Sequence, residues 1–567
     1  MRTFRRESGL YLLALLIGLV VRLIGLGAQP LSEFEAAWAL QALDVANGTR
    51  IALGSQPAYV ALTSALFVAF GGASNALARI IPALTGSALI LVPALFKDRL
   101  KPRPALLLAF AFALEPGLTS LSRQAGSSIM VVTFALAAWG LWEKRQLKWA
   151  GVCAGMALLA GTGLWVGLLA FAITWALLRP FVHVAQSHVN PPLGASERGL
   201  RREWITMGSY ALGAIVLLGT MFMTVPGGLS AWIAGLPEYI VGWTRVSDIP
   251  GSLLLLSLIA YQPLGVLLAV IAIVRGWLQG SARVRRLSLW MVVALLLALF
   301  YPSRQIVDLA WMLIPLWALA SMEAARLLNV PRAERREVLG AVALSFVILV
   351  FVWLDFLALR RPGIPPDQAR LRTWLVLGSF FLLVVSMLLV AVGWSTRIAR
   401  FGALWGVAAF LCVYSLGVLM AAAGHRTVPK STEMWSPGAQ LPMAGLLLRT
   451  VHEQSAWSDA DINAQPVTIA GIDSPALRWL LRDRPVELRS TTGAAADPPM
   501  VITRDEQDPA LVSAYRGQPL VWRSTPIWRP FRFQEWLPFH EAAHETETVI
   551  LWVRNDLFPD AKPRLTP

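Results

Sequence analysis

Two carboxylates lie close together directly after the first long apolar stretch of the chain. Glu33 and Glu35 belong to the segment 29–38, and the apolar stretch before it covers residues 9–27. Ionised groups beside hydrocarbon are costly and are candidates for function by default, and this position would suit the handling of a lipid-linked substrate. The structural alternative is that Ser32 caps a helix whose first turn carries both acids.

Composition places these acids in a membrane protein. Hydrophobic residues make up 56% of the 567 residues, charged residues make up 15%, and mean hydropathy is +0.59, which excludes a water-soluble globule. The net charge of +15 does not indicate nucleic-acid binding, because Lys and Arg fall in short clusters between apolar stretches. Cys153 and Cys412 lie within apolar runs, so no disulfide framework or cysteine-based metal site is expected.

Apolar stretches that approach the length of a bilayer crossing, at about 1.5 Å per residue, recur throughout residues 1–423. The first follows a basic start that lacks a small-residue cleavage site, so we expect a retained span. The run 57–70 is too short to cross and is expected to lie on the outer surface, within a first outer loop at 28–75. The remaining stretches predict about 13 transmembrane helices, at 9–27, 76–96, 104–117, 128–142, 149–161, 163–179, 207–225, 252–274, 287–301, 306–323, 337–359, 371–393 and 400–423.

Charge supports this topology. With a cytoplasmic N-terminus, basic clusters that include 97–101, 143–145, 283–286 and 397–400 all fall on the cytoplasmic side, as the positive-inside pattern requires. The loop around 360–372 is the exception, because its four arginines fall outside. They indicate either an anionic ligand near this loop or a wrong count of spans nearby.

The composition changes at Gly424 to a soluble mixture of charged and turn residues. Segments that start at Pro466 and Pro498 predict strands, as does 549–553, and Ser474 followed by Pro475 predicts the start of a helix. We expect residues 424–567 to form a small α/β domain outside the cytoplasm, and residues 1–423 to form the transmembrane domain.

The order of short motifs resembles the GT-C superfamily of membrane glycosyltransferases, in the branch of protein O-mannosyltransferases and aminoarabinose transferases (glycosyltransferase family 39). Phe34 stands where the family usually has a catalytic Asp before the Glu that aligns with Glu35, and Gln56 stands where aminoarabinose transferases carry a Lys for the lipid phosphate. No carboxylate follows Arg123, where the family commonly has another acid. The motifs that carry the resemblance are Arg22, Pro30 to Trp38, Gly48, Gln56-Pro57-Ala58-Tyr59, Phe70-Gly71, Arg79, Glu115-Pro116, Ser122-Arg123, Tyr301-Pro302-Ser303-Arg304, Ser474 to Asp483 and Leu551 to Arg554.

The resemblance implies a GT-C-like fold and transfer of a sugar from a polyprenyl-phosphate donor. We expect no cofactor besides this donor substrate, and the sequence leaves a requirement for a divalent metal open. A carboxylate would deprotonate the acceptor while cations hold the phosphate leaving group. Glu35 is preferred slightly over Glu33 as this base, by the alignment. The departure at Phe34 implies that Glu33 substitutes for the family Asp or that catalytic activity is lost.

Arginines near the outer ends of spans are the candidates for holding the phosphate. Arg79, Arg123 and Arg304 offer the planar, bidentate match to phosphate oxygens, and all three fall on the outer side of the topology. The alternatives are snorkelling or ion pairing, and Arg304 is placed to pair with Asp308 four residues later. Gln56 is a candidate for substrate binding through its alignment, and Tyr59 either stacks on a sugar or anchors the membrane interface.

The segment His540 to His544 matches the zinc-protease pattern H-E-x-x-H, which requires a helix to bring both imidazoles to one face. Pro538 precedes it and a strand-like run follows it, so we expect no metal site there.

The leading interpretation is a glycosyltransferase at the outer face of the plasma membrane, with a glycan, lipid or protein as acceptor. The alternative is a catalytically inactive relative that binds lipid-linked glycans or acts as a scaffold in envelope glycan assembly or export. A secondary transporter is disfavoured, because the sequence has no matching halves with interrupted helices.

Overall fold

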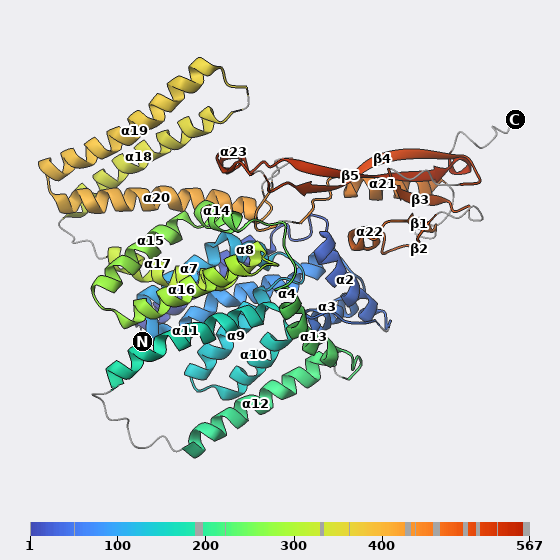
Figure 1. The fold of residues 1–567 in the computed structure, drawn as a ribbon, viewed down its shortest axis with the longest axis horizontal. Helices are drawn as coiled ribbons and strands as arrows, with labels where there is room; N and C mark the ends of the chain where they lie inside the picture. Colours follow the sequence, from blue (N-terminus) through green and yellow to red (C-terminus); the bar gives the residue numbers. More distant parts are fainter. Residues whose placement is uncertain are drawn as a thin grey trace.

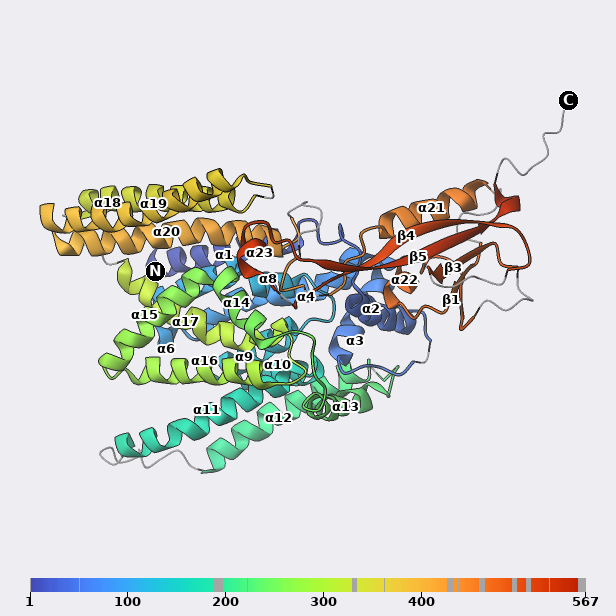
Figure 2. The same cartoon turned by 45° about the horizontal axis from the view of Figure 1, so that its top comes forward.

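The fold is taken from a computed structural model in which helices form one large bundle and a β-sheet lies at one end of it (Figure 1). The sheet belongs to the C-terminal part of the chain, and helices near the N-terminus lie between it and the rest of the bundle (Figure 2). The structure describes residues 2–49, 51–186, 197–221, 223–328, 334–361, 363–425, 432–436, 438–457, 465–491, 497–505, 511–529 and 531–558.

The helical part is built from apolar helices that are punctuated by proline, glycine and capping residues. Short 3-10 turns, η1 (Leu89–Leu91) and η2 (Ile306–Leu309), continue into helices. The helices are α1 (Arg2–Leu23), α2 (Glu33–Ala46), α3 (Pro57–Phe70), α4 (Asn75–Ala88), α5 (Val92–Leu95), α6 (Lys97–Leu100), α7 (Pro102–Leu114), α8 (Pro116–Ser122), α9 (Ile129–Glu143), α10 (Leu147–Leu159), α11 (Gly163–Gln186), α12 (Glu197–Gly219), α13 (Gly228–Val241), α14 (Gly251–Tyr261), α15 (Pro263–Leu278), α16 (Ala282–Phe300), α17 (Ala310–Leu327), α18 (Arg335–Leu359), α19 (Pro366–Gly393) and α20 (Thr396–Ala422).

Within the described residues, five helices are long and apolar enough to cross a membrane alone, and three bent pairs meet the same criterion together. The run 57–70 forms the separate helix α3 with those bounds. The stretch 252–274, predicted as a span, is not one continuous helix, because α14 and α15 meet at 94°. Pro263 explains the break, since proline lacks an N–H and disfavours the helical conformation of the residue before it. The count of 13 spans stays a prediction.

The basic clusters gather at the end of the bundle opposite the sheet, where the N-terminus and α6 also lie (Figure 2). Arg99 pairs with Glu143, and Lys144 pairs with Asp98, which joins the clusters at 97–101 and 143–145. The arginine-rich loop 360–372 lies at the other end, since Arg360 donates to Gln534 of the C-terminal part. We call these two ends of the bundle the basic end and the sheet end.

The C-terminal part holds a mixed five-stranded sheet in the order β2-β1-β3-β5-β4. β1 is parallel to β2 and β3, whereas β5 is antiparallel to β3 and β4. The strands predicted from Pro466 and Pro498 are present, and Ser474 caps the predicted helix by accepting from the N–H of Leu477. The elements are α21 (Ala444–Trp457), β1 (Val467–Ala470), α22 (Pro475–Leu480), β2 (Val486–Arg489), β3 (Met500–Arg504), β4 (Tyr515–Pro526), α23 (Phe533–Phe539), β5 (His544–Arg554) and η4 (Asn555–Leu557).

The segment with the H-E-x-x-H pattern is not helical. His540 ends α23 in the left-handed conformation, with φ of 56°, and His544 begins β5. Their imidazoles bond to different partners, His540 Nδ1 to Glu433 and His544 Nε2 to Thr432. The two rings therefore do not share one helix face, which the zinc-binding pattern requires.

Candidate functional site

A cavity of about 580 Å³ lies where the helical part meets the C-terminal part. We call it the junction cavity. Its wall comes from the loop after α1, the start of α4, the end of α8, the end of α20 and the segment around 433–442. The charged and amide side chains among its lining residues are Glu35, Arg79, Arg123, Gln124, Gln29, Glu433 and Gln440.

Glu35 and Arg79 form a buried bidentate ion pair in this wall. Arg79 Nε lies 2.7 Å from Glu35 Oε1 and Arg79 Nη2 lies 2.8 Å from Oε2, and each side chain is 7% exposed. The same guanidinium donates to the carbonyl oxygens of Leu26, Gln29 and Pro30. Arg79 thus holds the loop between α1 and α2 as well as the acid.

Glu35 has further donors, which come from its own helix start and from the loop after α8. Ser32 and Glu35 form a capping box, in which the Ser32 N–H donates to Oε2 at 3.0 Å. The Ala125 N–H donates to Oε1 at 3.0 Å. Burial alone would raise the pKa of Glu35, but the Arg79 charge and these hydrogen bonds outweigh burial and hold the pKa below its ordinary value. A carboxylate stabilised in this way is a weak general base near neutral pH.

Arg123 is the second cation of the junction cavity, and no acidic side chain pairs with it among the described residues. It donates to the carbonyl oxygens of Val21, Arg22, Ile24 and Gly25 at the end of α1. Those bonds use the two Nη atoms. Burial, and next the charge of Arg79, lower the pKa of Arg123 to about 10. Arg123 remains a cation at neutral pH. An anion in the cavity would offset both the burial of its charge and its repulsion by Arg79.

Glu433 is an acid of the cavity that sequence reasoning missed. Its Oε2 accepts from the hydroxyl of Tyr261 at 2.6 Å, and its Oε1 lies 2.8 Å from His540 Nδ1. It is the one acid lining the cavity, within the described chain, that no arginine neutralises. It lies in the segment before α21, ten residues beyond the end of the predicted span 400–423 and within the part expected to be soluble, so no motif or span boundary indicated it.

Gln124 is a second missed residue, although it directly follows the Ser-Arg motif. Its amide nitrogen donates to the Trp435 carbonyl oxygen at 2.8 Å and to Ser120 Oγ at 3.1 Å. This contact fixes the segment that carries Glu433 against the end of α8. Gln124 therefore joins the two halves of the cavity wall.

Glu33 does not line the junction cavity, and its contacts are with the C-terminal part. Its carboxylate accepts from Ser474 Oγ at 2.7 Å, from the Ala476 N–H at 2.9 Å and from Arg523 Nε at 2.8 Å. The last two donors lie at the start of α22 and on β4. Glu33 is thus a docking residue in this structure, because all of its hydrogen bonds hold the sheet against α2.

Phe34, between the two acids, is 55% exposed and packs edge-on against Trp38. Its ring supplies no proton acceptor at the position where the resemblance predicts the catalytic Asp.

The remaining predicted residues do not line the junction cavity. Tyr59 is fully buried and donates to the Ala78 carbonyl oxygen at 2.8 Å, so it neither stacks on a ligand in the cavity nor anchors an interface. Gln56 donates to the Gly126 carbonyl oxygen, and its own oxygen is buried without a hydrogen-bond partner. Arg304 donates to the Tyr301 carbonyl oxygen. The expected pair of Arg304 with Asp308 is wrong, because that carboxylate instead caps η2 by accepting from the Gln305 N–H.

The arrangement combines one cation without a counter-ion, Arg123, and one acid without an arginine partner, Glu433, on the wall of a single cavity. Such a site can hold an anionic group and offer a proton acceptor nearby. In the described part of the chain, no group of three or more His, Cys, Asp or Glu side chains could hold a metal ion.

The helical bundle with a C-terminal sheet over one end is a GT-C-type fold. It matches the structure of ArnT from Cupriavidus metallidurans bound to undecaprenyl phosphate, with a TM-score of 0.54 and 14% identity, over 98% of this chain and 100% of that one. The apo structure of the same ArnT aligns over 96% and 98% of the two chains, with a TM-score of 0.45 and 13% identity. The Archaeoglobus fulgidus oligosaccharyltransferase in complex with Zn and sulfate aligns over 87% and 68%, with a TM-score of 0.39 and 13% identity.

No protein-family model and no curated protein matches the sequence. The chain is accordingly similar in fold to ArnT, and its apolar helices make it a multi-pass membrane protein.

Proposed function

We propose that this protein is a membrane glycosyltransferase that binds a polyprenyl-phosphate-linked sugar in the junction cavity and transfers the sugar to an acceptor. The observation that carries the proposal is that one cavity wall holds both Arg123, a cation without an acidic partner, and Glu433, an acid without an arginine partner. A GT-C-type fold supports the same conclusion, since the structurally similar ArnT is seen with undecaprenyl phosphate.

The cavity lies between membrane-spanning helices and the C-terminal part, a position that suits a substrate with a lipid chain and a polar sugar. Arg123 directly follows α8, whose bent pair with α7 is apolar enough to cross a membrane, and Glu433 belongs to the C-terminal part. The lipid phosphate would lie at Arg123, at the depth of the head groups, while the sugar would extend toward Glu433. With the basic end in the cytoplasm, the cavity faces the outer side of the plasma membrane.

The reaction assigns one role to each of these side chains. Glu433 accepts the proton of the acceptor hydroxyl, whose oxygen attacks the anomeric carbon of the sugar. The bond from that carbon to the phosphate oxygen breaks, and the polyprenyl phosphate leaves with the electron pair. Arg123 stabilises the negative charge on the departing phosphate. Glu35 does not act as the base in this scheme, because Arg79 already neutralises it and it holds the cavity wall instead.

A second candidate is a carrier-binding protein without transferase activity. It is favoured by the exposed Phe34 in place of the family Asp and by the engagement of Glu33 and Glu35 in other contacts. Both candidates require the phosphate to bind, and they differ in whether Glu433 performs chemistry.

The test is a transfer assay with purified full-length protein in vesicles, a mixture of radiolabelled polyprenyl-phosphate sugars, and total membrane extract as the source of acceptor. We expect Glu433→Gln to lower transfer by roughly 10²–10⁴-fold, the usual contribution of a general base. Lipid binding should be unchanged. Glu453→Gln is the matched control, because Glu453 is an exposed acid of α21 away from the cavity.

The outcomes separate the candidates. Transfer by the wild type that survives in Glu433→Gln would remove Glu433 as the base. Binding of the labelled lipid without any transfer by the wild type would support the carrier-binding protein. Absence of both binding and transfer would contradict the proposal altogether.

A further inference from the structure

A second cavity lies at the basic end of the bundle, away from the junction cavity. Its volume is about 830 Å³, within the usual range for small-molecule sites. Its wall comes from α7, α9, α11, α16 and α17 and from the turn around α6. We call it the basic-end cavity, and none of its lining residues belongs to the C-terminal part or to the junction cavity.

One wall of this cavity is a cluster of aromatic rings. The Trp139 ring centroid lies 5.3 Å from that of Phe96, 5.7 Å from Phe171 and 6.1 Å from Trp290. Leucine and isoleucine side chains extend the same surface along α9, α11 and α17. This wall is suited to hydrocarbon, because aromatic and aliphatic side chains offer it a large apolar area.

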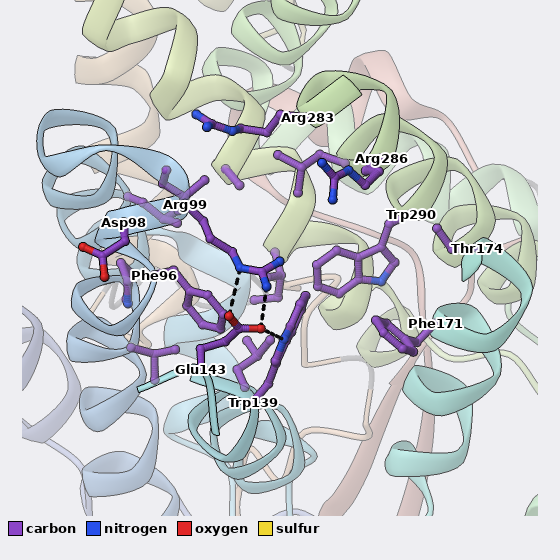
Figure 3. A pocket seen from close by; sticks show the side chains of 18 of the residues that line it. Phe96, Asp98, Arg99, Trp139, Glu143, Phe171, Thr174, Arg283, Arg286 and Trp290 are labelled. Atoms are coloured by element: carbon purple, nitrogen blue, oxygen red, sulfur yellow. Dashed lines mark hydrogen bonds and ion pairs between the residues drawn. The ribbon is translucent and has the colours of Figure 1, made fainter. Parts of the chain in front are cut away.

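The other feature of the cavity is a pair of arginines that the protein leaves without counter-ions. Both acids of the wall are already neutralised: Glu143 accepts from Arg99 at 2.6 and 3.1 Å, and Asp98 pairs with Lys144. Figure 3 shows Arg283 and Arg286 around the same cavity as the Arg99–Glu143 pair.

Arg283 and Arg286 have no acidic partner among the described side chains. Arg286 donates to the Ala282 carbonyl oxygen. Arg283 is the second residue of α16 and Arg286 is the fifth, and a positive charge near the start of a helix opposes the helix dipole. The two arginines therefore do not stabilise this end of the helix. A bound anion beside them would stabilise it, because its negative charge is favourable near a helix N-terminus.

Trp290 links these two features of the cavity. Its ring belongs to the aromatic wall, and it lies four residues after Arg286 on α16.

We propose that the basic-end cavity binds an anionic phospholipid, with its phosphate between Arg283 and Arg286 and an acyl chain along the aromatic wall. Guanidinium groups one turn apart match a phosphate group. These arginines directly precede the apolar run of α16, which puts them at the depth of lipid head groups. The apolar wall favours a lipid over free phosphate, which has no group to bury there. The proposal does not depend on the function of the junction cavity.

The experiment is native mass spectrometry of the purified full-length protein, with phosphatidylglycerol or phosphatidylcholine of identical acyl chains added to the detergent. We expect one phosphatidylglycerol to be retained at least tenfold more tightly than phosphatidylcholine. The double variant Arg283→Gln/Arg286→Gln should weaken this binding at least tenfold. A second double variant, to Lys at both positions, keeps the charge that sets membrane orientation and should bind between these two limits.

Arg400→Gln is the matched control. Arg400 is a basic-end arginine that also donates to the backbone four residues earlier, to Thr396, but it does not line the cavity. Its loss should leave phosphatidylglycerol binding unchanged. Equal binding by wild type and the Gln double variant would overturn the proposal, as would equal weakening by Arg400→Gln. Displacement of the lipid by millimolar inorganic phosphate would show a simple anion site and would overturn the lipid assignment.

Discussion

Replacing Arg79 by glutamine should destabilise the protein strongly, because it leaves the buried Glu35 carboxylate without its cation. Each partner side chain is only 7% exposed, and breaking a buried ion pair by removing one partner costs ~3–5 kcal/mol. Three donors remain for the carboxylate, from Ser32 N–H, Ser32 Oγ and Ala125 N–H, and they reduce the cost of burying it. The carbonyl oxygens of the loop after α1 lose their donors at the same time, which adds ~1 kcal/mol.

We therefore expect Arg79→Gln to lower the free energy of unfolding by ~3–5 kcal/mol. The assay is SDS-induced unfolding of the purified protein in mixed micelles, followed by circular dichroism. The double variant Glu35→Gln/Arg79→Gln completes a thermodynamic cycle and should be less destabilised than Arg79→Gln, because it no longer buries an unpaired charge. A loss below ~1 kcal/mol for Arg79→Gln, the range of exposed pairs, would show that the Arg79–Glu35 pair does not behave as a buried ion pair.

Three further predictions concern the elements around the junction cavity. Since the pKa of Glu35 is held below its ordinary value, its pairing stabilises the protein at neutral pH, and that contribution should be lost as pH falls below about 4.3; Glu35→Gln should remove this part of the pH dependence in unfolding experiments. Glu33→Gln should loosen the C-terminal part from α2 by ~1–2 kcal/mol, since its carboxylate is about a quarter exposed. Hydrogen exchange in residues 474–476 should accelerate while exchange in α9 stays unchanged. Gly126→Ala should destabilise the protein by ~1–3 kcal/mol, because Gly126 has φ of 69° and a Cβ there would lie 2.4 Å from the Trp38 ring. Gly213→Ala, with open space around a helical position, should be neutral or stabilising in the same unfolding assay.

The parts of the fold that follow from periodicity and local signals were predictable from the sequence. The run 57–70 is a helix because it starts at a proline and is followed by Gly71, a glycine with φ of 67°, both of which are local signals. Ser32 caps α2 and Ser474 caps α22 for the same reason. Strand β4, by contrast, has largely exposed residues in its first half. It shows no apolar alternation there and was not predicted.

The candidate site was predictable where it depends on residues near span ends. The sequence indicated Glu35, Arg79 and Arg123, and the structure brings all three to one cavity. It did not indicate that Glu33 would bond to Arg523, because no local pattern reports a contact between residues so far apart in sequence. The same limit explains why Glu433 was missed, since the cavity forms only when the C-terminal part docks.

Equilibrium binding of undecaprenyl phosphate to the purified protein tests most directly whether the junction cavity binds a polyprenyl phosphate through Arg123. Arg123→Gln should weaken binding at least tenfold, which corresponds to about 1.4 kcal/mol. Arg304→Gln should bind as the wild type does, because Arg304 also bonds to a backbone carbonyl but lies outside the cavity wall. Equal affinity for wild type and Arg123→Gln, with both proteins folded, would show that Arg123 does not hold the lipid phosphate.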